Sequence, residues 1–270
     1  MQLVGKTALV TGAAGGIGRA TAHALANDGA NVALVDNLQG YDGARPVDAD
    51  SLAVIRKEIE ATGRQAIDLV VDLTEPGALG AMVEETVRQL GSIDVLFNNA
   101  AITWQRDFFD VTEDEWDLMH RVNARAAFFC MQRVARQMVD QGNGGSIINI
   151  ASIAAKGFRE TSNAAYAASK GAVVAMSLTA AHALGQHSIR VNAICPGVTR
   201  TPMMLGVFAE RSVEREVPFS ELETQLNEMI PLGRFNEAED IAAFAVFLAG
   251  TNGRNITGQS INVDGGLVMH

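Results

Sequence analysis

Short apolar segments alternate with longer helical patterns along almost the whole chain. Seven segments are mostly apolar, as strands buried on both faces of a sheet are, and a helical pattern follows each of the first six. The predicted strands are residues 7–10, 32–35, 66–71, 93–97, 146–150, 189–194 and 260–263. Helices that return the chain to the same edge after each strand place the strands in parallel. The sequence therefore predicts an α/β fold with a doubly wound, seven-stranded parallel sheet and helices on both faces.

Glycines and capping residues mark the limits of the predicted helices. Gly29, Gly63 and Gly91 each follow a helical pattern, at the position where a left-handed backbone ends a helix. Thr112 and Glu115 have the spacing of a capping box, which predicts a long helix that begins there. The predicted helices are residues 16–28, 51–62, 76–90, 112–140, 164–185 and 237–249.

Two connections are longer than the others. They span residues 37–50 and residues 196–231, each after a predicted strand. Long connections at the carboxyl ends of parallel strands usually shape a ligand crevice. We expect the second to form a lid over a substrate, whereas the first is equally consistent with a surface insertion. No linker or repeat interrupts the pattern, so residues 1–270 are predicted to form one domain.

The charge balance and the cysteines exclude several classes of protein. The chain has 31 acidic and 21 basic residues and a net charge of −10, so neither nucleic acids nor anionic membranes are expected partners. Cys130 and Cys195 are not spaced like a disulfide framework or a metal site, so we expect no metal and a reducing compartment. The N-terminus lacks a signal-peptide pattern, and the longest apolar stretch, residues 241–250, is half of the roughly 20 residues that a membrane helix needs. A cytoplasmic location is therefore expected.

A glycine-rich turn follows the first predicted strand. Gly12, Gly16 and Gly18 allow a tight turn and a close approach of the backbone to a ligand. With Ile17 they open the first predicted helix, whose free N–H groups attract a pyrophosphate. The spacing differs from G-x-G-x-x-G and lacks the Gly-Lys-Ser/Thr ending of a Walker loop. Its position at the start of a βαβ unit nevertheless favours a dinucleotide site over a simple turn.

Asp36 ends the second predicted strand. A carboxylate at this position accepts hydrogen bonds from the ribose hydroxyls of an adenosine and repels a 2′-phosphate. The flanking residues, two alanines in the glycine turn and Asn37, provide no cation for that phosphate, so NAD is favoured over NADP. The alternative is an aspartate that only caps the next loop. Asp72 and Leu73, after the third strand, are candidates for contact with adenine, and Asp72 is equally consistent with a helix cap.

Tyr166 and Lys170 lie four residues apart on one face of the predicted helix 164–185. An ammonium beside a phenol lowers the pKa of the phenol from about 10, which suits a general acid/base at a hydroxyl or carbonyl. The rest of this helix is small and apolar, so an unpaired lysine on it needs a function. Ser152, after the preceding strand, is placed to bind the same substrate oxygen. Asn123, in the long helix, is placed to hold a water or a backbone group.

Taken together, these residues resemble the short-chain dehydrogenase/reductase family over residues 5–269. The resemblance implies a Rossmann-type fold, a single dinucleotide-binding and catalytic domain, a nicotinamide cofactor and a Ser-Tyr-Lys mechanism with a supporting Asn. The markers that carry it are residues 11–18, Asp72-Leu73, Asn98-Asn99-Ala100, Asn123, Ser152, Tyr166 with Lys170, Pro196-Gly197 and Asp264-Gly265-Gly266.

The resemblance also implies a role for each matching residue. Tyr166 would give or take the proton at the substrate oxygen, and Lys170 would lower its pKa and bind the nicotinamide ribose. Ser152 would orient the substrate oxygen, and Asn123 would hold the water of a proton relay. The further cofactor contacts would be Asn99 and Ala100 on the adenosine side, the Thr199 main chain at the carboxamide and Thr201 at the phosphates.

The sequence departs from the family pattern at three places. Ala101 stands where glycine is usual, and we expect a small structural effect. The spacing from Ser152 to Tyr166 is one residue longer than usual, so the loop between them is expected to bulge. The insertion after Asp36 resembles that of some members reported to hold NAD tightly.

We expect an NAD-dependent oxidoreductase that reversibly transfers a hydride between nicotinamide and a secondary alcohol or ketone, such as a polyol, a sugar or a cyclic alcohol. One alternative is an NADPH-type β-ketoacyl thioester reductase, against which Asp36 argues. The other is a non-catalytic NAD-binding regulator, against which Tyr166 and Lys170 argue.

The substrate and the assembly are less constrained. Arg159 and Glu160 would favour a polar substrate if they point inward, and they are ordinary surface charges if they point outward. Because relatives are mostly tetramers, a homotetramer is expected. The candidate pocket residues are Trp104, Phe158, Arg159, Glu160, Met203, Met204 and Phe208.

Overall fold

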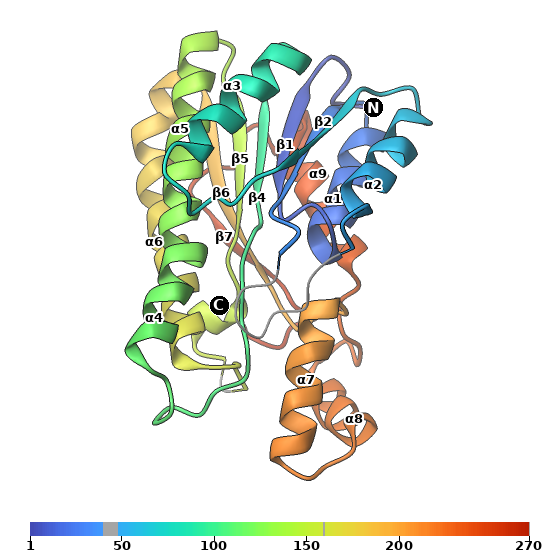
Figure 1. The fold of residues 1–270 in the computed structure, drawn as a ribbon, viewed down its shortest axis with the longest axis vertical. Coiled ribbons are helices and arrows are strands. Elements are labelled where there is room, and N and C mark those ends of the chain that lie inside the picture. Colours follow the sequence, from blue (N-terminus) through green and yellow to red (C-terminus); the bar gives the residue numbers. More distant parts are fainter. Residues whose placement is uncertain (40–47, 159, 270) are drawn as a thin grey trace.

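All strands of the computed structural model, which describes residues 1–39, 48–158 and 160–269, join one parallel sheet (Figure 1). The order across the sheet is β3-β2-β1-β4-β5-β6-β7, which confirms the predicted fold class. The chain runs outward from β1 to β3 and then crosses back to β4, and open α/β sheets bind ligands at the carboxyl ends of strands at such a reversal. The strands are β1 (Thr7–Thr11), β2 (Asn31–Asp36), β3 (Ala66–Val70), β4 (Val95–Asn98), β5 (Gly145–Ile150), β6 (Ile189–Pro196) and β7 (Ser260–Val263).

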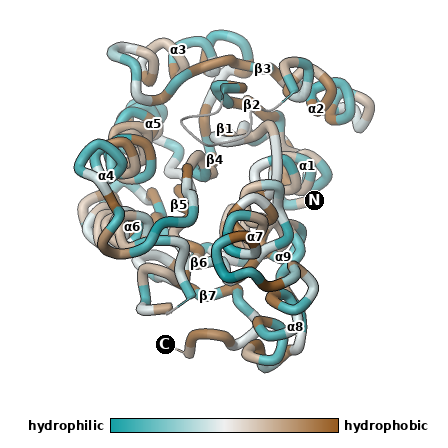
Figure 2. Tube along the Cα trace, turned by 60° about the horizontal axis from the view of Figure 1, so that its bottom comes forward, coloured by the Kyte–Doolittle hydropathy of each residue, from teal (hydrophilic) through white to brown (hydrophobic). Residues whose placement is uncertain are grey.

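Helices cover both faces of the sheet (Figures 1 and 2). Helices α1, α2 and α9 pack on one face, and α3, α5 and α6 pack on the other. Within the described ranges, no helix is long and apolar enough to cross a membrane. The helices are α1 (Gly16–Asn27), α2 (Ser51–Glu60), α3 (Ala78–Leu90), α4 (Glu113–His120), η1 (Arg121–Ala126), α5 (Ala127–Gln141), η2 (Ile153–Lys156), α6 (Ala164–Leu184), η3 (Gly185–His187), α7 (Pro202–Glu214), α8 (Phe219–Met229), α9 (Ala238–Ala249) and η4 (Thr251–Gly253).

Successive residues of the central strands point into different layers of the core. In β1, Ala8 and Val10 pack with the helices of one face, while Leu9 packs with those of the other. All three side chains are fully buried. The continuous apolar character of the strand in the sequence follows from this arrangement, because both of its faces are covered.

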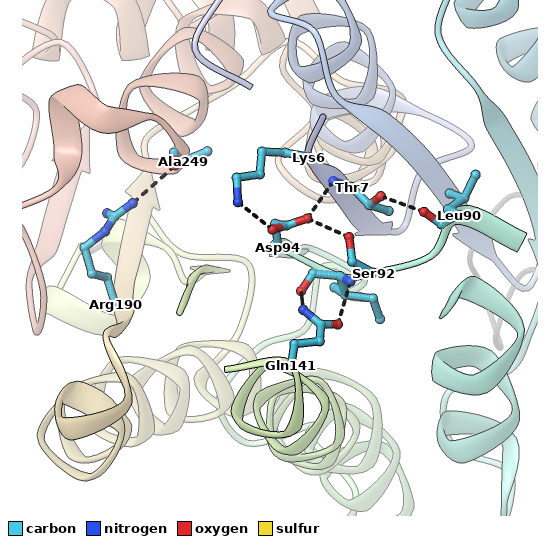
Figure 3. Close-up of polar contacts among 9 residues, drawn as sticks. Lys6, Thr7, Leu90, Ser92, Asp94, Gln141, Arg190 and Ala249 are labelled. Carbon is cyan, nitrogen blue, oxygen red and sulfur yellow. Dashed lines mark hydrogen bonds and ion pairs between the residues drawn. The ribbon is translucent and has the colours of Figure 1, made fainter. Parts of the chain in front are cut away.

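A polar network ties the amino-terminal edge of the sheet together (Figure 3). The Asp94 carboxylate accepts hydrogen bonds from Lys6 Nζ at 2.8 Å and from the Thr7 main-chain N–H at 3.0 Å. Gln141, at the end of α5, makes two bonds of 2.9 Å to the main chain of Ile93. These contacts fasten β1, β4 and α5 to one another at the edge opposite the carboxyl ends of the strands.

The helix expected from residue 112 contains a π-helical segment. Its capping box forms as predicted, because Thr112 Oγ1 accepts from the Glu115 N–H at 3.2 Å and the Glu115 carboxylate accepts from the Thr112 N–H at 3.1 Å. Beyond α4, the six residues of η1 are π-helical before α5 continues. The wider turn holds Asn123, which is 1% exposed. A second difference is that the helix expected from residue 76 begins at Ala78, because Gly77 has a φ of +82°.

The long connection before α9 folds into helices α7 and α8, which extend beyond the sheet at its carboxyl end (Figure 1). Phe208 of α7 packs with Leu222 and Leu226 of α8 in a separate apolar cluster that also contains Phe235. The amphipathic pattern of this connection is explained by that small core. Its role as a substrate lid stays a prediction. Most of the other long connection, residues 40–47, lies outside the described residues.

Candidate active site

The glycine turn joins β1 to α1 at the point where the sheet order reverses. Gly12 and Gly16 have φ angles of +66° and +51°, a region that favours glycine. A Cβ on Gly12 would lie 2.7 Å from Asn99 Nδ2, and one on Gly18 would collide with the Gly12 carbonyl oxygen. Among the described residues, no side chain caps α1, whose N-cap residue is Gly15, and none comes within 4 Å of the position that a Cβ on this glycine would take. The first N–H groups of α1 are therefore suited to an anion.

Residues 197–201 run alongside the same turn. A Cβ on Gly16 would lie 3.1 Å from Thr201 Cγ2, so Thr201 adjoins the turn as predicted for a phosphate contact. Thr201 also caps α7, where its hydroxyl accepts from the Met204 N–H at 3.3 Å. Thr199 is buried, and its hydroxyl donates to the Gly197 carbonyl at 3.0 Å, which leaves its main chain as the part available to a ligand. Ile17 is partly buried against the core.

Asn99 and Ala100 fasten β4 to the glycine turn. Their main-chain N–H groups both donate to Thr11 Oγ1, at 2.9 and 3.1 Å. Asn99 Nδ2 also donates to the Thr11 and Gly12 carbonyls at 3.0 and 3.2 Å. Asn99 thus fixes the glycine turn to the end of β4, and the hydroxyl of Thr11 links the end of β1 to that of β4. We call the glycine turn and the N-terminus of α1 the cradle. Sequence reasoning included Thr11 only as the first residue of the glycine-turn marker, because its bonds to Asn99 and Ala100 depend on a distant strand.

Asp36 and Asp72 both bind nearby main-chain groups. The Asp36 carboxylate accepts from the Ala14 N–H of the glycine turn at 3.1 Å and from the Leu38 N–H at 3.0 Å. It therefore caps its own loop and lies beside the turn at the same time, so the two interpretations of this residue are compatible. Asp72 accepts from the Thr74 N–H and hydroxyl at 2.8 Å each, which makes it a turn residue well before α3 begins. The Leu73 side chain packs against the core.

Ser152, Tyr166 and Lys170 meet at the carboxyl end of β5. Ser152 follows this strand and is hydrogen-bonded to the Tyr166 hydroxyl. Lys170 Nζ lies 5.8 Å from the centroid of the Tyr166 ring and donates to the Ile150 carbonyl at 2.8 Å. Lys170 is 2% exposed, as expected from the apolar sequence of its helix. The structure thus brings together the three side chains predicted to carry the chemistry.

The pKa of Tyr166 shifts in the direction opposite to the prediction. Burial raises the pKa of its hydroxyl, and the hydrogen bond with Ser152 offsets only part of that rise. Burial also lowers the pKa of the Lys170 ammonium to about 8. The expectation that Lys170 lowers the pKa of Tyr166 is therefore wrong for the chain by itself, because desolvation dominates and the ammonium is directed at the Ile150 carbonyl.

Cys195 is a neighbour of this group that sequence reasoning did not connect with it. It is fully buried near the end of β6, in the apolar cluster that contains Ala151 and Val173. Burial raises the pKa of the Cys195 thiol, so the side chain is an inert part of the wall. A lone cysteine in an apolar strand gives no signal of such a position.

Asn123 holds the backbone of the loop after β4. Its Oδ1 accepts from the Ile102 N–H at 2.8 Å, and its Nδ2 donates to the Ile102 carbonyl at 2.9 Å and to Ser169 Oγ at 3.1 Å. Of the two expected partners, a water or a backbone group, the side chain therefore binds the backbone group. The predicted role in a proton relay stays a prediction.

Asn163 is a further residue that sequence reasoning missed. It caps α6 by accepting from the Tyr166 N–H at 2.7 Å, and its Nδ2 donates to the Trp104 carbonyl at 2.7 Å. The signal was present, because an asparagine immediately before the first helical residue is a typical N-cap. Its second bond could not be predicted from the sequence.

The candidate pocket residues occupy different environments. Trp104 is buried in a cluster that includes Tyr166, and Phe158 contacts both the wall near Cys195 and the cluster of α7 and α8. Phe208 is buried and Met204 partly buried in the latter cluster, whereas Met203 is 43% exposed. The Glu160 carboxylate faces Arg211 of α7 and Arg215, the C-cap residue of that helix, and Arg159 lies outside the described residues. In the described part of the chain, no group of His, Cys, Asp and Glu side chains could hold a metal.

Comparison with known proteins agrees with this geometry. A family model described as enoyl-(acyl carrier protein) reductase matches residues 12–268. A short-chain dehydrogenase/reductase of Armillaria gallica is 39% identical over 265 residues, which cover 98% of this chain and 97% of the relative. The chain belongs to the short-chain dehydrogenase/reductase family. The resemblance noted in its motifs is thereby confirmed.

Other similar members of the short-chain dehydrogenase/reductase family differ in their named activities. Sorbitol dehydrogenase of Cereibacter sphaeroides is 38% identical, with 98% of each chain covered. A 3-oxoacyl-[acyl-carrier-protein] reductase of Thermotoga maritima is 36% identical, with both chains covered completely. Carveol dehydrogenase of Mycobacterium avium, solved in complex with NAD, has a TM-score of 0.93 at 27% identity and 98% coverage of both chains. This chain is therefore an oxidoreductase of a family that binds a nicotinamide cofactor.

Proposed function

We propose that this oxidoreductase uses NAD to interconvert a secondary alcohol and the corresponding ketone. The observation that carries the proposal is the group of Ser152, Tyr166 and Lys170 at the carboxyl end of β5. It provides two hydroxyls and a buried ammonium beside one apolar wall, the cluster that contains Ala151, Val173 and Cys195. Such a group can bind a carbonyl or hydroxyl oxygen and exchange a proton with it.

The cradle around β1 and α1 fits a dinucleotide. The uncapped N-terminus of α1 would hold the pyrophosphate, with Thr201 beside it. The Asp36 carboxylate would accept the ribose hydroxyls, since each of its oxygens accepts only one backbone bond among the described residues. The same charge disfavours a 2′-phosphate, which supports NAD over NADP. The bound nicotinamide supplies a carbon that accepts or donates a hydride.

The chain's own residues manage the proton and the position of the substrate oxygen. Burial keeps the Tyr166 phenol protonated near neutral pH, so it can donate to a developing alkoxide when a ketone is reduced. In the oxidative direction Tyr166 must first lose this proton, and its phenolate oxygen then takes the alcohol proton, so the raised pKa favours this direction at alkaline pH. Ser152 holds the other side of the substrate oxygen, and Lys170 fixes the wall by its bond to the Ile150 carbonyl. Ser152 and Lys170 are buried beside this wall, while Tyr166 is partly exposed.

The substrate is proposed by class. The similarity to sorbitol and carveol dehydrogenases supports a polyol, sugar or cyclic alcohol. The Glu160 carboxylate is engaged by arginines, so it does not provide a free acid for a polyol. A second candidate, reduction of a 3-oxoacyl thioester, is favoured by the similarity to the Thermotoga maritima reductase.

A substrate and cofactor panel tests the proposal. NADH or NADPH formation would be followed with sorbitol, cyclohexanol and carveol, and acetoacetyl-CoA would be offered in the reductive direction. We expect turnover of at least one alcohol, with kcat/KM at least about tenfold higher for NAD than for NADP. Turnover of acetoacetyl-CoA alone with NADPH would favour the second candidate. Tight NADH binding without any turnover would favour a regulator.

Tyr166→Phe is the matched control for the chemistry. It removes one oxygen and should lower kcat roughly 100- to 10,000-fold, the usual contribution of a general acid/base. NADH binding, followed by fluorescence, should persist because the cradle is unchanged. Activity retained in this variant would refute the assignment of Tyr166 as the general acid/base.

We also propose a cytoplasmic location and a homotetramer. The first is supported by Cys130 and Cys195, both of which are free and buried. The second is supported by large apolar side chains exposed on helices: Trp116, Phe128, Phe129, Leu178 and Phe247.

A further inference from the structure

Arg211 is a buried cation on a helix that is otherwise largely exposed. Only this residue and Phe208 are buried in α7, and 4% of the Arg211 side chain is exposed. Burial lowers the pKa of its guanidinium, so the charge needs partners to remain there. The ring of Phe208 lies beneath it, at 5.9 Å from the guanidinium carbon.

The partners of Arg211 lie on the two loops that lead into the active site. Its Nη2 donates to the Glu160 carbonyl at 3.1 Å, to the Thr161 carbonyl at 3.4 Å and to Gln105 Oε1 at 3.2 Å. Its Nη1 donates to the Glu160 carboxylate at 3.4 Å. Nε has no partner among the described residues, so the bonds of Nη1 and Nη2 alone hold the buried guanidinium.

From these loops, hydrogen bonds continue to the start of α6. The Ser162 carbonyl accepts from the Arg106 N–H at 3.1 Å, and its hydroxyl is 2.6 Å from that of Thr103. Asn163 then binds the Trp104 carbonyl and the Tyr166 N–H, both at 2.7 Å. The segment 160–163 is thus clamped between α7 and the loop after β4, and it ends on the backbone of Tyr166.

We propose that Arg211 is a positioning residue that couples the position of α7 to that of Tyr166. Displacement of α7 would leave its buried charge without partners unless residues 160 and 161 move with it. Residues 160 and 161 are followed within two positions by Asn163, the N-cap of α6. The Tyr166 hydroxyl is therefore correctly placed only when α7 is seated. This inference rests on the proposed function, because it assigns the residue to the same reaction.

Arg215 provides a matched control. It is the C-cap residue of α7, four positions after Arg211, and donates to the same Glu160 oxygen at 3.1 Å, but 46% of its side chain is exposed. An exposed ion pair contributes little to stability. Arg215→Met should therefore leave the coupling intact, whereas Arg211→Met removes the buried charge and its bonds to both carbonyls.

The first measurement is amide hydrogen exchange of residues 160–166 in the chain without cofactor. Arg211→Met should speed this exchange at least about tenfold, and Arg215→Met should leave it unchanged. This measurement needs no substrate. If no alcohol is turned over, the proposed function fails, while exchange alone still decides whether the coupling exists.

The second measurement is kinetic, with the best alcohol of the panel. Arg211→Met should lower kcat roughly 10- to 100-fold, because a small displacement of a catalytic group is costly, while the Kd for NADH stays within about twofold. Asn163→Ser keeps the cap of α6 and loses the bond to Trp104. It therefore interrupts the hydrogen-bonded connection from Arg211 to Tyr166 at a second point. The double variant should be little worse than the worse single variant, because coupled residues are not additive.

Unchanged exchange and kcat in Arg211→Met would overturn the proposal, as would additive losses in the double variant. If Arg211→Met fails to fold, Arg211→Lys and Asn163→Ser carry the test. The lysine keeps the charge but cannot reach both carbonyls in the geometry of a guanidinium, so exchange and kcat should be intermediate. Full activity and protection in both of these variants would equally refute the coupling.

Discussion

At the scale of the residue, Asp36 combines two tasks. It holds the glycine turn through the Ala14 N–H and its own loop through the Leu38 N–H. We expect Asp36→Asn to reduce the ratio of kcat/KM for NAD to that for NADP at least about tenfold, because it removes a negative charge that repels the 2′-phosphate. Steady-state kinetics with both cofactors measure the ratio. Asp50→Asn, an exposed carboxylate before α2, is the control, and an unchanged ratio in Asp36→Asn would contradict the proposed discrimination.

Lys170 makes the stability of the chain depend on pH. Its pKa falls from 10.5 to about 8 on folding, so between these values the unfolded chain binds more protons than the folded chain. Stability therefore rises with pH through this window, and the penalty for burying the charge is largest below pH 8. Between pH 7.5 and 9.5 the free energy of unfolding of the wild type, relative to Lys170→Met, should increase by about 2 kcal/mol. Urea unfolding at both pH values measures it, and equal pH dependence of the two chains would refute the shift.

At the scale of the element, the π-helical segment η1 holds Asn123 where it can bind Ile102. We expect Asn123→Ala to lower the free energy of unfolding by about 2 kcal/mol, because it leaves the buried Ile102 N–H and carbonyl without partners. Activity should fall with it, since the adjacent loop contributes to the site. Chemical denaturation together with kcat measures both effects.

Thr112→Ala is the comparison for this element. It removes the cap of α4 and should cost about 1 kcal/mol while leaving kcat unchanged. Equal losses of activity in the two variants would mean that Asn123 acts only through the stability of the helix.

The same element illustrates what could be read from local pattern. The capping box at Thr112 was predictable, because it depends on residues three positions apart. The π-helical segment was not, because its extra residue per turn is stabilised by contacts such as that of Asn123 with Ile102, far away in the sequence. The helices α7 and α8 were likewise foreseen only as an amphipathic stretch, since their apolar faces serve a core shared with Phe235.

At the scale of the whole molecule, exposed aromatic side chains on α5 support assembly. Phe128 and Phe129 are 39% and 37% exposed, and Arg125 lies over the second ring. We expect a mass in light scattering near four times 28.6 kDa, and a smaller mass for Phe129→Asp. Phe109→Asp is the control, because Phe109 is 91% exposed on a loop outside these helices and should not affect the mass. A monomeric wild type would refute the tetramer.

Local sequence by itself determined the alternation of strands and helices, the glycine turn and the residues proposed to carry the chemistry. These depend on periodicity, on backbone conformations open to glycine and on motif spacing, which near neighbours in the chain define. Tertiary structure alone decided the partners of Arg211, the second bond of Asn163 and the direction of the pKa shift of Tyr166. Each of these depends on burial and on which distant groups are brought together. An ammonium four residues away in the sequence is therefore outweighed by the desolvation that the rest of the fold imposes.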